Sequence, residues 1–394
     1  MRIAIKATHI TSGGGLTHLN KIIEWFGKLA PEIQFELIGK KGQNSLFLSE
    51  PGNFDYRYYD FPARSLAAQL WWERYHLPEV LRELRCGLLF EPGNYGTLSA
   101  SCPKITLVHN LAPFDKEIIK NVSLYQKTRL NLLRNATVQS IQTSDGIIFL
   151  SNFAREVISK YVDLRPKYTR VIYHGAPEPG NSIDLREISG KYGIQSEFIL
   201  CVSHFYRYKH IMELAQGYIK AAANDNSLPP LIIAGAEYDH EYASRIKDII
   251  NQSNFRDRIK LIGPISELEL GAFYASCKFF IFPSILENCP NILIEALGNG
   301  CAVLCSNAGV MPEICGEAAL YFDASDIDDI AAKLYQANSD ESLLGRLKEC
   351  ARIRARYFSW EKTARETLEF FERILNLSGV VDSESKIGEL VKTK

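Results

Sequence analysis

The stretch that decides the fold is FPSILENCPNILIEALGNG, from Phe282 to Gly300. It starts at the end of a strand-like apolar run, FFIFPS, and passes through a short loop into an apolar helix, NILIEALGNG. Pro290 suits the first turn of that helix, because its missing N–H costs nothing there, and Gly298 or Gly300 would end it. A buried strand that leads through a loop into a helix is typical of a parallel α/β sheet.

The same alternation of strands and helices recurs along the chain on both sides of a probable linker sequence, GAPEPGNSIDLRE, residues 175–187. Before this linker, strand-like runs are RIAIKA, IQFELIGK, GLLFEPG, KITLVHN, GIIFLS and RVIYHG. After it come EFILCVS, PLIIAGA, IKLIG, FFIFPS, CAVLCS and AALYF, with helices expected near 211–223 and 241–251. We therefore predict an α/β protein with two doubly wound domains.

The last part of the chain differs from this pattern. FSWEKTARETLEFFERIL has the apolar stripe of an amphipathic helix, with Ser359 as its N-cap, and the sequence after it is polar. The predicted boundaries are 1–178 for the first domain, 179–358 for the second, 359–378 for the helix and 379–394 for a polar tail.

Composition excludes several classes of function. The 394 residues carry 45 basic and 46 acidic side chains, and a net charge of −1 gives no overall attraction to nucleic acid. Nine cysteines without a CxxC pair, and without a nearby histidine pair at zinc spacing, indicate reduced core residues of a cytoplasmic protein. No signal peptide is visible, and no apolar run approaches the roughly 18–20 residues of a membrane span, so we expect any membrane contact to be peripheral.

Ligands of doubly wound sheets bind outside the carboxyl ends of the strands, so the loops that follow strands are the first candidates. Glu287 lies in such a loop, and Glu295 lies on the helix that follows. The N–H groups of Asn291, Ile292 and Leu293 lie between them, at the positive end of the helix. Two acceptors for hydroxyls beside an anion-binding helix end suit a nucleotide sugar. The alternative is a solvated loop glutamate and a glutamate that complements the helix dipole.

Two further strand-end features lie in the first domain. In TSGGGLTH, Gly13, Gly14 and Gly15 let the backbone approach an anion beside a helix N-terminus, although a plain tight turn is the alternative. The pattern is not GxGxxG, which argues against NAD. In LVHNLAPF, His109 ends a strand-like run, where it could stabilise charge, donate a hydrogen bond to a sugar hydroxyl or have only a structural role.

A basic loop follows the first strand of the second domain. CVSHFYRYKH gathers His204, Arg207, Lys209 and His210 between a strand and a helix. Cations that converge on a strand-end loop suit a phosphate or pyrophosphate. The alternative is a solvated basic loop with no ligand.

Taken together, these four sites resemble the retaining GT-B glycosyltransferases of family 4, the glycosyl transferases group 1 family. The most specific part is the E-x7-E motif, Glu287 to Glu295, within FPSILENCPNILIEALGNGCAVLCSNAGVMPEICGEAALYF. SNFAREVI, YHGAP, IIAGA and GPISELELGAFYASCKFFIFPS also resemble segments of the family, so the resemblance spans nearly the whole chain. It implies a GT-B fold, with two Rossmann-like domains facing across a cleft and a C-terminal helix crossing back to the first.

The resemblance also implies roles. Glu287 would contact hydroxyls of the transferred sugar, and Glu295 would bind the ribose of the nucleotide. The loop Gly13–Gly15 would line the cleft near the pyrophosphate and the acceptor, and His109 would lie beside the donor sugar.

The family usually neutralises the diphosphate with an arginine and, five positions later, a lysine. Here Lys209 matches the lysine, while His204 occupies the position of the arginine, so Arg207 or a protonated His204 would supply the missing charge. The resemblance implies no cofactor and no metal. Asp328–Asp329 is expected to begin a helix rather than to form a metal-binding dyad.

The implied function is retaining transfer of a hexose from a UDP- or GDP-linked sugar to a hydroxyl of a glycan or lipid-linked saccharide, in cell-surface polysaccharide or lipopolysaccharide synthesis. No carboxylate is clearly placed as a nucleophile, which favours front-face attack through an oxocarbenium-like state. Two alternatives stay open: a non-hydrolysing sugar-nucleotide 2-epimerase, and a catalytically silent GT-B binding subunit.

The first domain would form the acceptor side of the protein. Trp71, Trp72 and the basic, plausibly helical stretch 115–134 could together touch a membrane surface and a lipid-linked glycan. The alternative is core packing of the tryptophans and a solvated basic face.

Overall fold

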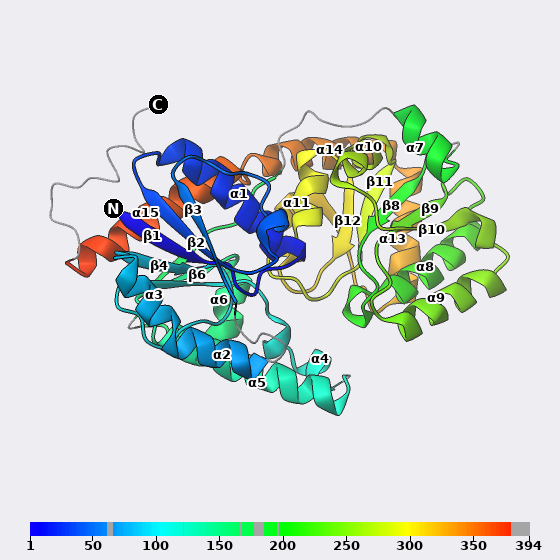
Figure 1. Ribbon diagram of the computed structural model, residues 1–394. Helices are drawn as coiled ribbons and strands as arrows, with labels where there is room; N and C mark the ends of the chain where they lie inside the picture. Colours follow the sequence, from blue (N-terminus) through cyan, green and yellow to red (C-terminus); the bar gives the residue numbers. More distant parts are fainter. Residues whose placement is uncertain (61–65, 121, 166, 177–184, 195–196, 380–394) are drawn as a thin grey trace. The chain divides into compact units, whose positions relative to one another are not determined.

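Two parallel sheets form the framework of the protein, each within its own unit of a computed structural model (Figure 1). The structure describes residues 1–60, 66–120, 122–165, 167–176, 185–194 and 197–379. Unit 1 comprises Met1–Gly175 with Trp360–Lys394, and unit 2 comprises Ala176–Ser359. The predicted domain boundary at 178/179 and nearly all of the predicted polar tail lie outside the described residues.

The sheet of unit 1 has the strand order β3-β2-β1-β4-β5-β6-β7, with every neighbouring pair parallel. Its strands are β1 (Arg2–Lys6), β2 (Gln34–Lys40), β3 (Phe54–Tyr59), β4 (Leu88–Glu91), β5 (Lys104–Val108), β6 (Gly146–Phe149) and β7 (Tyr168–Val171). The inner strands β4, β5 and β6 are buried along their whole length, as expected for a parallel sheet with helices on both faces.

The helices of unit 1 connect these strands in the usual crossover manner. They are α1 (Gly13–Leu29), α2 (Leu66–Tyr75), α3 (Leu77–Glu83), α4 (Lys116–Lys120), α5 (Leu124–Gln142), α6 (Asn152–Ser159) and α15 (Trp360–Leu377), with 3-10 turns at Asn44–Leu46 and Ala112–Phe114. The basic stretch 115–134 is therefore not one helix. Ser123 begins a new helix there, because its hydroxyl accepts a hydrogen bond from the Gln126 N–H at 3.3 Å.

Helix α15 belongs to unit 1 although more than half of the chain separates it from β1 (Figure 1). The Phe371 ring packs against Phe26 of α1 and Phe90 of β4, with centroid distances of 5.8 and 5.0 Å. A Cβ atom on Gly146 would lie 2.9 Å from Phe370, so only glycine allows the helix to approach β6 this closely. The prediction that the last helix crosses back to the first domain is confirmed.

The sheet of unit 2 has the order β10-β9-β8-β11-β12-β13, again with parallel neighbours. Its strands are β8 (Ile199–Val202), β9 (Leu231–Ala234), β10 (Ile259–Gly263), β11 (Phe279–Phe282), β12 (Val303–Ser306) and β13 (Ala319–Phe322). This order is the 3-2-1-4-5-6 arrangement of the Rossmann fold, and the first six strands of unit 1 show it as well. The predicted α/β class with two doubly wound domains is confirmed.

The helices of unit 2 lie close to where the sequence places them. They are α7 (Leu185–Tyr192), α8 (Ile211–Asn224), α9 (His240–Gln252), α10 (Glu267–Ser276), α11 (Asn291–Gly298), α12 (Met311–Cys315), α13 (Ile327–Ser339) and α14 (Glu341–Ala355), with 3-10 turns at Arg207–Lys209, Arg256–Arg258 and Gly316–Ala318. Asp328 and Asp329 begin α13, as predicted. Gly300, with φ of 69°, stands just after α11 in the conformation that commonly ends helices.

Candidate functional site

The candidate donor site lies where the strand order of the unit 2 sheet reverses, on either side of β8. Strand β8 has β9 on one side and β11 on the other, so the loops after β8 and β11 leave the sheet at its topological switch point. The two loops are joined, because the Ile285 N–H donates a hydrogen bond to the Tyr208 carbonyl at 3.0 Å. The predicted basic loop and the first predicted glutamate are therefore brought together.

Glu287 and Lys209 form an ion pair between these two loops. Their side chains are only 17% and 14% exposed, so the pair is shielded from water on most sides. The Lys209 ammonium also lies over the rings of Tyr208 and Phe282, at 5.3 and 5.6 Å from their centroids. Without a ligand, the Lys209 charge is thus largely offset by the carboxylate that the sequence suggested for a sugar hydroxyl.

Arg207 lies near two carboxylates at the start of α9. Its Nε lies 3.3 Å from Asp239, and its terminal nitrogen lies 3.6 Å from Glu241. The guanidinium is 44% exposed, which leaves it free to change partners. Both cations of the predicted phosphate loop therefore face carboxylates in this structure.

His204 is held as a hydrogen-bond acceptor. Its Nδ1 accepts from the Ala236 N–H at 3.2 Å, and the edge of its ring meets Tyr238. Partial burial lowers the pKa of His204, the nearby Lys209 lowers it further, and Glu287 opposes them. The hypothesis that a protonated His204 replaces the missing arginine is therefore not supported, which leaves Arg207 and Lys209 as the charges of this loop.

Glu295 is partly buried beside Tyr274, on the helix that follows the same loop. The Tyr274 hydroxyl donates to Glu295 Oε2 at 3.3 Å and lies 3.0 Å from the Ile292 carbonyl. Burial raises the pKa of Glu295 to about 7, the negative charge of Glu267 adds to this, and the tyrosine bond opposes it. The carboxyl group therefore changes charge near neutral pH, which the sequence did not indicate.

The N-terminus of α11 differs in one respect from the expectation. The Leu293 N–H already donates to the Pro290 carbonyl at 3.1 Å, so it is engaged within the helix start. Asn291 and Ile292, the other two predicted positions, lie in the first turn of the helix. The helix has no acidic side chain in its first turn, so its positive end is not neutralised from within that turn.

Unit 1 has its own switch point between β1 and β4, and a pocket of about 270 Å³ lies there. The loops after β1, β4 and β5 form its walls, together with the start of α1 and one side of α5. The residues with polar side chains around it are His9, Thr11, Ser12, Asn94, Tyr95, His109, Asn110, Arg129 and Thr137. Two predicted site residues, Gly15 and His109, meet in this pocket.

The three predicted glycines are not a loop before the helix, because α1 begins at Gly13. They form its first turn, and a Cβ on Gly15 would lie 3.8 Å from His109 Nε2. Burial lowers the pKa of His109 to about 4, against an opposing hydrogen bond with the Gly14 backbone. At neutral pH His109 is therefore an uncharged imidazole at the start of α1, suited to hydrogen bonding rather than to charge stabilisation.

His109 is one of three neighbouring imidazoles. His18 of α1 and His174, just after β7, bring one ring nitrogen each to within 4.8 Å of one another and of His109. Trp360 stacks on the His18 ring at 5.9 Å and lies 5.4 Å from His174. Among the described residues this is the one group of histidine, cysteine or carboxylate side chains close enough together to ligate a metal ion. Metal independence stays a prediction.

Asn94 fixes the loop that carries His109. Its Oδ1 accepts from the backbone N–H groups of His109 and Asn110, at 2.8 and 2.6 Å. Its own amide donates to the Asn110 carbonyl. Asn94 therefore couples the loop after β4 to the loop after β5, and the sequence reasoning missed it.

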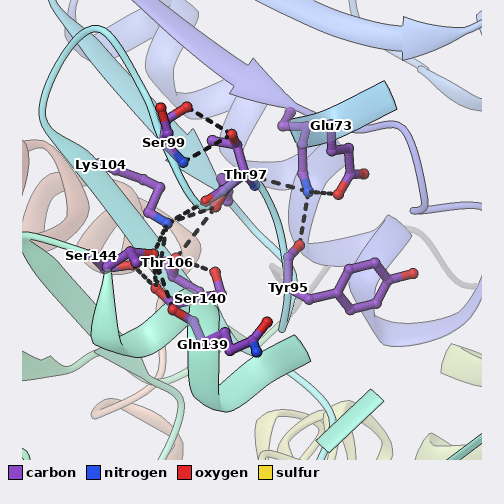
Figure 2. A network of polar contacts seen from close by, with 12 residues as sticks. Glu73, Tyr95, Thr97, Ser99, Lys104, Thr106, Gln139, Ser140 and Ser144 are labelled. Carbon is purple, nitrogen blue, oxygen red and sulfur yellow. Dashed lines mark hydrogen bonds and ion pairs between the residues drawn. The ribbon is translucent and has the colours of Figure 1, made fainter. Parts of the chain in front are cut away.

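A network of polar contacts reaches the loop after β4, which lines this pocket with residues 92–95 (Figure 2). Lys6 of β1, fully buried, lies 3.1 Å from Glu73 and 3.5 Å from Glu91, and it donates to the Tyr95 carbonyl at 2.8 Å. Glu91 in turn accepts from the Thr97 N–H at 3.0 Å. The loop 92–97 is thus tied to β1 at the edge where ligands of such sheets bind.

Sequence reasoning found His109 because it follows a strand, and the same rule would have found more. His9 follows β1, Asn94 follows β4 and His174 follows β7, each within a few residues. Arg129 has no such signal, since it lies inside α5 and reaches the pocket only through the fold. Tyr274, the partner of Glu295, lies on a neighbouring helix and has no local signal either.

Comparison with known proteins finds a family model that covers most of unit 2. Residues 184–354, nearly all of unit 2, match the sequence model of the family described as "Glycosyl transferases group 1". This part of the chain is a group 1 glycosyl transferase domain. The matched range contains the E-x7-E motif and the whole loop after β8, so the group 1 domain is the unit with the candidate donor site.

Proteins similar to this chain include bacterial sugar transferases. "Serotype-specific mannosyltransferase WbdA" from Escherichia coli is 27% identical over 71% of this chain and 34% of its own length. "O-antigen chain mannosyltransferase B" from Escherichia coli is 24% identical over 63% of this chain and 66% of its own length. The chain thus spans about a third of the length of the WbdA proteins that it matches.

Solved structures show the fold of the whole chain. Sucrose-phosphate synthase from Thermosynechococcus elongatus covers 96% of this chain and is covered completely, with a TM-score of 0.75 and 17% identity. HepE from Anabaena, solved with UDP and glucose, has a TM-score of 0.72 and 15% sequence identity. The match covers 94% of this chain and 99% of the HepE chain. The predicted GT-B fold is confirmed.

No helix among the described residues is both long enough and apolar enough to cross a membrane. Of the two tryptophans considered for membrane contact, Trp72 is 6% exposed and packs in the core, whereas Trp71 is 53% exposed. Core packing thus accounts for one of the two.

Proposed function

We propose that the protein is a retaining glycosyltransferase of family 4. It transfers a hexose from a UDP- or GDP-linked sugar to a hydroxyl of a glycan or lipid-linked saccharide, in the synthesis of a cell-surface polysaccharide. The observation that carries this proposal is the Lys209–Glu287 pair at the switch point of the group 1 domain. The mannosyltransferase relatives support a mannosyl donor as the first to test.

In the proposed reaction, the bond between C1 of the sugar and the β-phosphate oxygen breaks, and its electron pair leaves with the diphosphate. A new bond forms between C1 and the acceptor oxygen on the same face, and the proton of the acceptor hydroxyl passes to the departing phosphate oxygen. Lys209 would turn from Glu287 toward the diphosphate and stabilise its growing negative charge. Arg207, half exposed, would add a second cation by leaving Asp239.

Glu287, once released by Lys209, accepts hydrogen bonds from hydroxyls of the transferred sugar. Glu295 accepts from the ribose hydroxyls in its ionised form, with Tyr274 fixing its orientation. His109, uncharged, is the proposed hydrogen-bond partner of a sugar hydroxyl. Asn94 acts as a positioning residue, since it touches His109 only through the backbone.

A donor panel with readout of released nucleotide tests this function. Purified protein would be incubated with GDP-mannose, UDP-glucose and UDP-N-acetylgalactosamine, with and without a saccharide acceptor, and the freed GDP or UDP measured. We expect release with one donor and its increase by an acceptor, with the anomeric configuration of the product retained. An epimerase would instead convert the donor sugar without releasing nucleotide, and inversion at C1 would contradict the retaining mechanism.

The silent binding subunit is the second candidate, and one observation favours it. Both cations of the loop face carboxylates and His204 is neutral, so the loop carries no surplus of positive charge. Nucleotide binding without release or transfer, for every donor, would establish this alternative.

A further inference from the structure

The pocket of unit 1 has a charge pattern that differs from a site for neutral sugars. Hydroxyls are held best by charged acceptors such as carboxylates, as proposed for Glu287 and Glu295. Among the residues that line this pocket there is no Asp or Glu, and Arg129 is the one Arg or Lys. The pocket therefore offers hydrogen-bond donors and a full positive charge, but no anionic acceptor.

Arg129 is available to a ligand. It lies on α5, exposed to solvent and at the rim of the pocket, and it makes no ion pair with any described carboxylate. In this respect it contrasts with Arg207, which faces two carboxylates. An unpaired guanidinium presents donors in a planar fork that matches a carboxylate or a phosphate.

His9 gives a second and independent sign of a ligand. It follows β1 and lines the pocket, and both of its ring nitrogens are buried without a hydrogen-bond partner among the described residues. Its ring is held in place, stacked on Tyr95 at 4.9 Å, and a Cβ on Gly93 would lie 1.9 Å from Nε2. Buried polar atoms are normally hydrogen-bonded, so a fixed ring without partners points to a missing one.

The start of α1 adds a further positive electrostatic potential to the pocket. Ser12 makes no side-chain cap, and the first turn holds no acidic residue, so nothing within that turn offsets the positive end of this helix of 17 residues. Ser12 and Gly15 both line the pocket. The amide of Asn110 is a further donor at the wall, because its own oxygen accepts from the Ala112 N–H.

We propose that this pocket binds an anionic saccharide, with its carboxylate or phosphate group paired to Arg129 and a polar group hydrogen-bonded to His9. The volume of about 270 Å³ is at the small end of ligand pockets, which commonly measure roughly 300–1,000 Å³, and suits one sugar unit with a charged substituent. This inference rests on the proposed function: it places the acceptor of that transfer in unit 1, and it names the acceptor as acidic.

Binding of matched charged and neutral probes tests the proposal. Methyl β-D-glucuronide and α-D-glucose 1-phosphate carry the two kinds of anion, and methyl β-D-glucoside is the neutral match. Ligand-observed NMR titration of the full chain would give the three affinities at low salt and at roughly 0.15 M ionic strength. We expect at least one charged probe to bind about tenfold more tightly than the glucoside, with a preference that decreases as salt rises. Which probe binds better separates a uronic acid from a sugar phosphate.

Variants on one helix connect the preference to Arg129. Arg129→Gln should reduce the affinity for the charged probe to that for the glucoside, whereas Arg129→Lys should keep part of the difference. Lys127→Gln is the matched control, because Lys127 is equally exposed on α5 and lies outside the pocket. Equal affinities for charged and neutral probes in the wild type, no detectable binding of either charged probe, or a preference that survives in Arg129→Gln would each overturn the proposal.

Nucleotide titrations show whether a negative result concerns the anion site or the proposed transferase function. UDP and GDP titrations of the same variants concern unit 2, where Arg129 has no part. If the nucleotides bind and the charged probes do not, only the acidic acceptor is wrong. If the charged probes bind and no nucleotide does, the anion site stands while the proposed transferase function fails. A melting curve of each variant would show that it is folded.

Discussion

The two switch points of the protein share one topology but differ in electrostatics. In unit 2, the loops after β8 and β11 hold cations that are already paired with carboxylates, as in Lys209–Glu287. In unit 1, the loops after β1 and β5 hold imidazoles with lowered pKa values, and α5 adds an arginine that makes no ion pair with any described carboxylate. The same strand order thus supports two kinds of site. In unit 2, cations must leave carboxylates before they can bind a ligand, whereas in unit 1 the hydrogen-bond donors can bind a ligand directly.

This difference has a physical basis in the proposed reaction. A diphosphate that leaves acquires charge during the step, so cations that shift from a carboxylate to the leaving group favour the transition state over the ground state. An acceptor changes little in charge before its proton leaves, and a fixed set of donors suffices to orient it. The predictions below test this division, from the largest expected effect to the smallest.

Glu287→Gln should have the largest effect, and in two opposite directions. Transfer should fall roughly 100- to 1,000-fold, because the sugar loses a charged acceptor near the reacting carbon. Affinity for UDP or GDP should rise, because Lys209 no longer has a competing carboxylate. Product assays and calorimetry measure the two effects, with Glu317→Gln, an exposed glutamate of the same unit, as control. Unchanged transfer would exclude the role of Glu287.

Lys209→Met should weaken the binding of UDP or GDP about 10- to 100-fold, the range expected for one or two lost hydrogen bonds to a charged group. Arg207→Met should have a smaller effect, because Asp239 and Glu241 already hold that side chain. Lys220→Met is a suitable control, since Lys220 pairs with the exposed Asp328 away from the loop. Calorimetry would measure the nucleotide affinity of each variant. A larger loss of affinity in Arg207→Met than in Lys209→Met would show that Arg207 is the main cation for the diphosphate.

Asn94→Ala should impair transfer, a function that needs unit 1, without affecting nucleotide binding by unit 2. Removing it leaves the N–H groups of His109 and Asn110 without their acceptor, which costs about 1–3 kcal/mol of stability. Transfer should fall about tenfold through displacement of His109, since a small misplacement already impairs alignment. Nucleotide affinity should stay unchanged. Steady-state kinetics and UDP titration would test this, with Asn135→Ala on α5 as control. Weaker nucleotide binding in Asn94→Ala would contradict the separation.

The smallest predicted effect is a pH dependence that Glu295 confers on nucleotide binding. Its pKa of about 7 means that the ionised carboxylate, the better acceptor for ribose hydroxyls, predominates only above neutral pH. Affinity should therefore increase several-fold from pH 6 to pH 8, less than the tenfold limit per pH unit for one proton. Glu295→Gln should bind weakly with a flat profile over the same range. A profile that declines with pH in the wild type would show that the protonated form binds.

Much of the fold could be predicted because buried parallel strands are continuous apolar runs. Each of FFIFPS, CAVLCS and EFILCVS became a strand of unit 2 at the expected place. The strand that was missed, β3, reads FDYRYY and lies at the edge of its sheet, paired only with β2. An edge strand keeps polar side chains toward water, so its sequence lacks the apolar signal.

The site was predictable as far as it follows strands. Glu287, Lys209 and His109 were found by that rule, and the structure brings the first two into contact. The charge states of Glu295 and His204 were not predictable, because they depend on burial and on partners from other elements: Glu267 and Tyr274 for Glu295, and Glu287 for His204. Sequence spacing describes one segment at a time, whereas a pKa depends on everything that surrounds the group.

The return of α15 to unit 1 has a consequence for the order in which the chain can mature on the ribosome. The apolar face formed by Phe26, Phe90 and Gly146 has no cover until the residues from Trp360 onward have emerged. Unit 2, whose chain is continuous, can complete its own core first. Most of unit 1 is therefore synthesised before unit 2, yet unit 1 is finished after it. A stop codon just before Trp360 would leave the group 1 domain intact while exposing the core of its neighbour to chaperones and proteases.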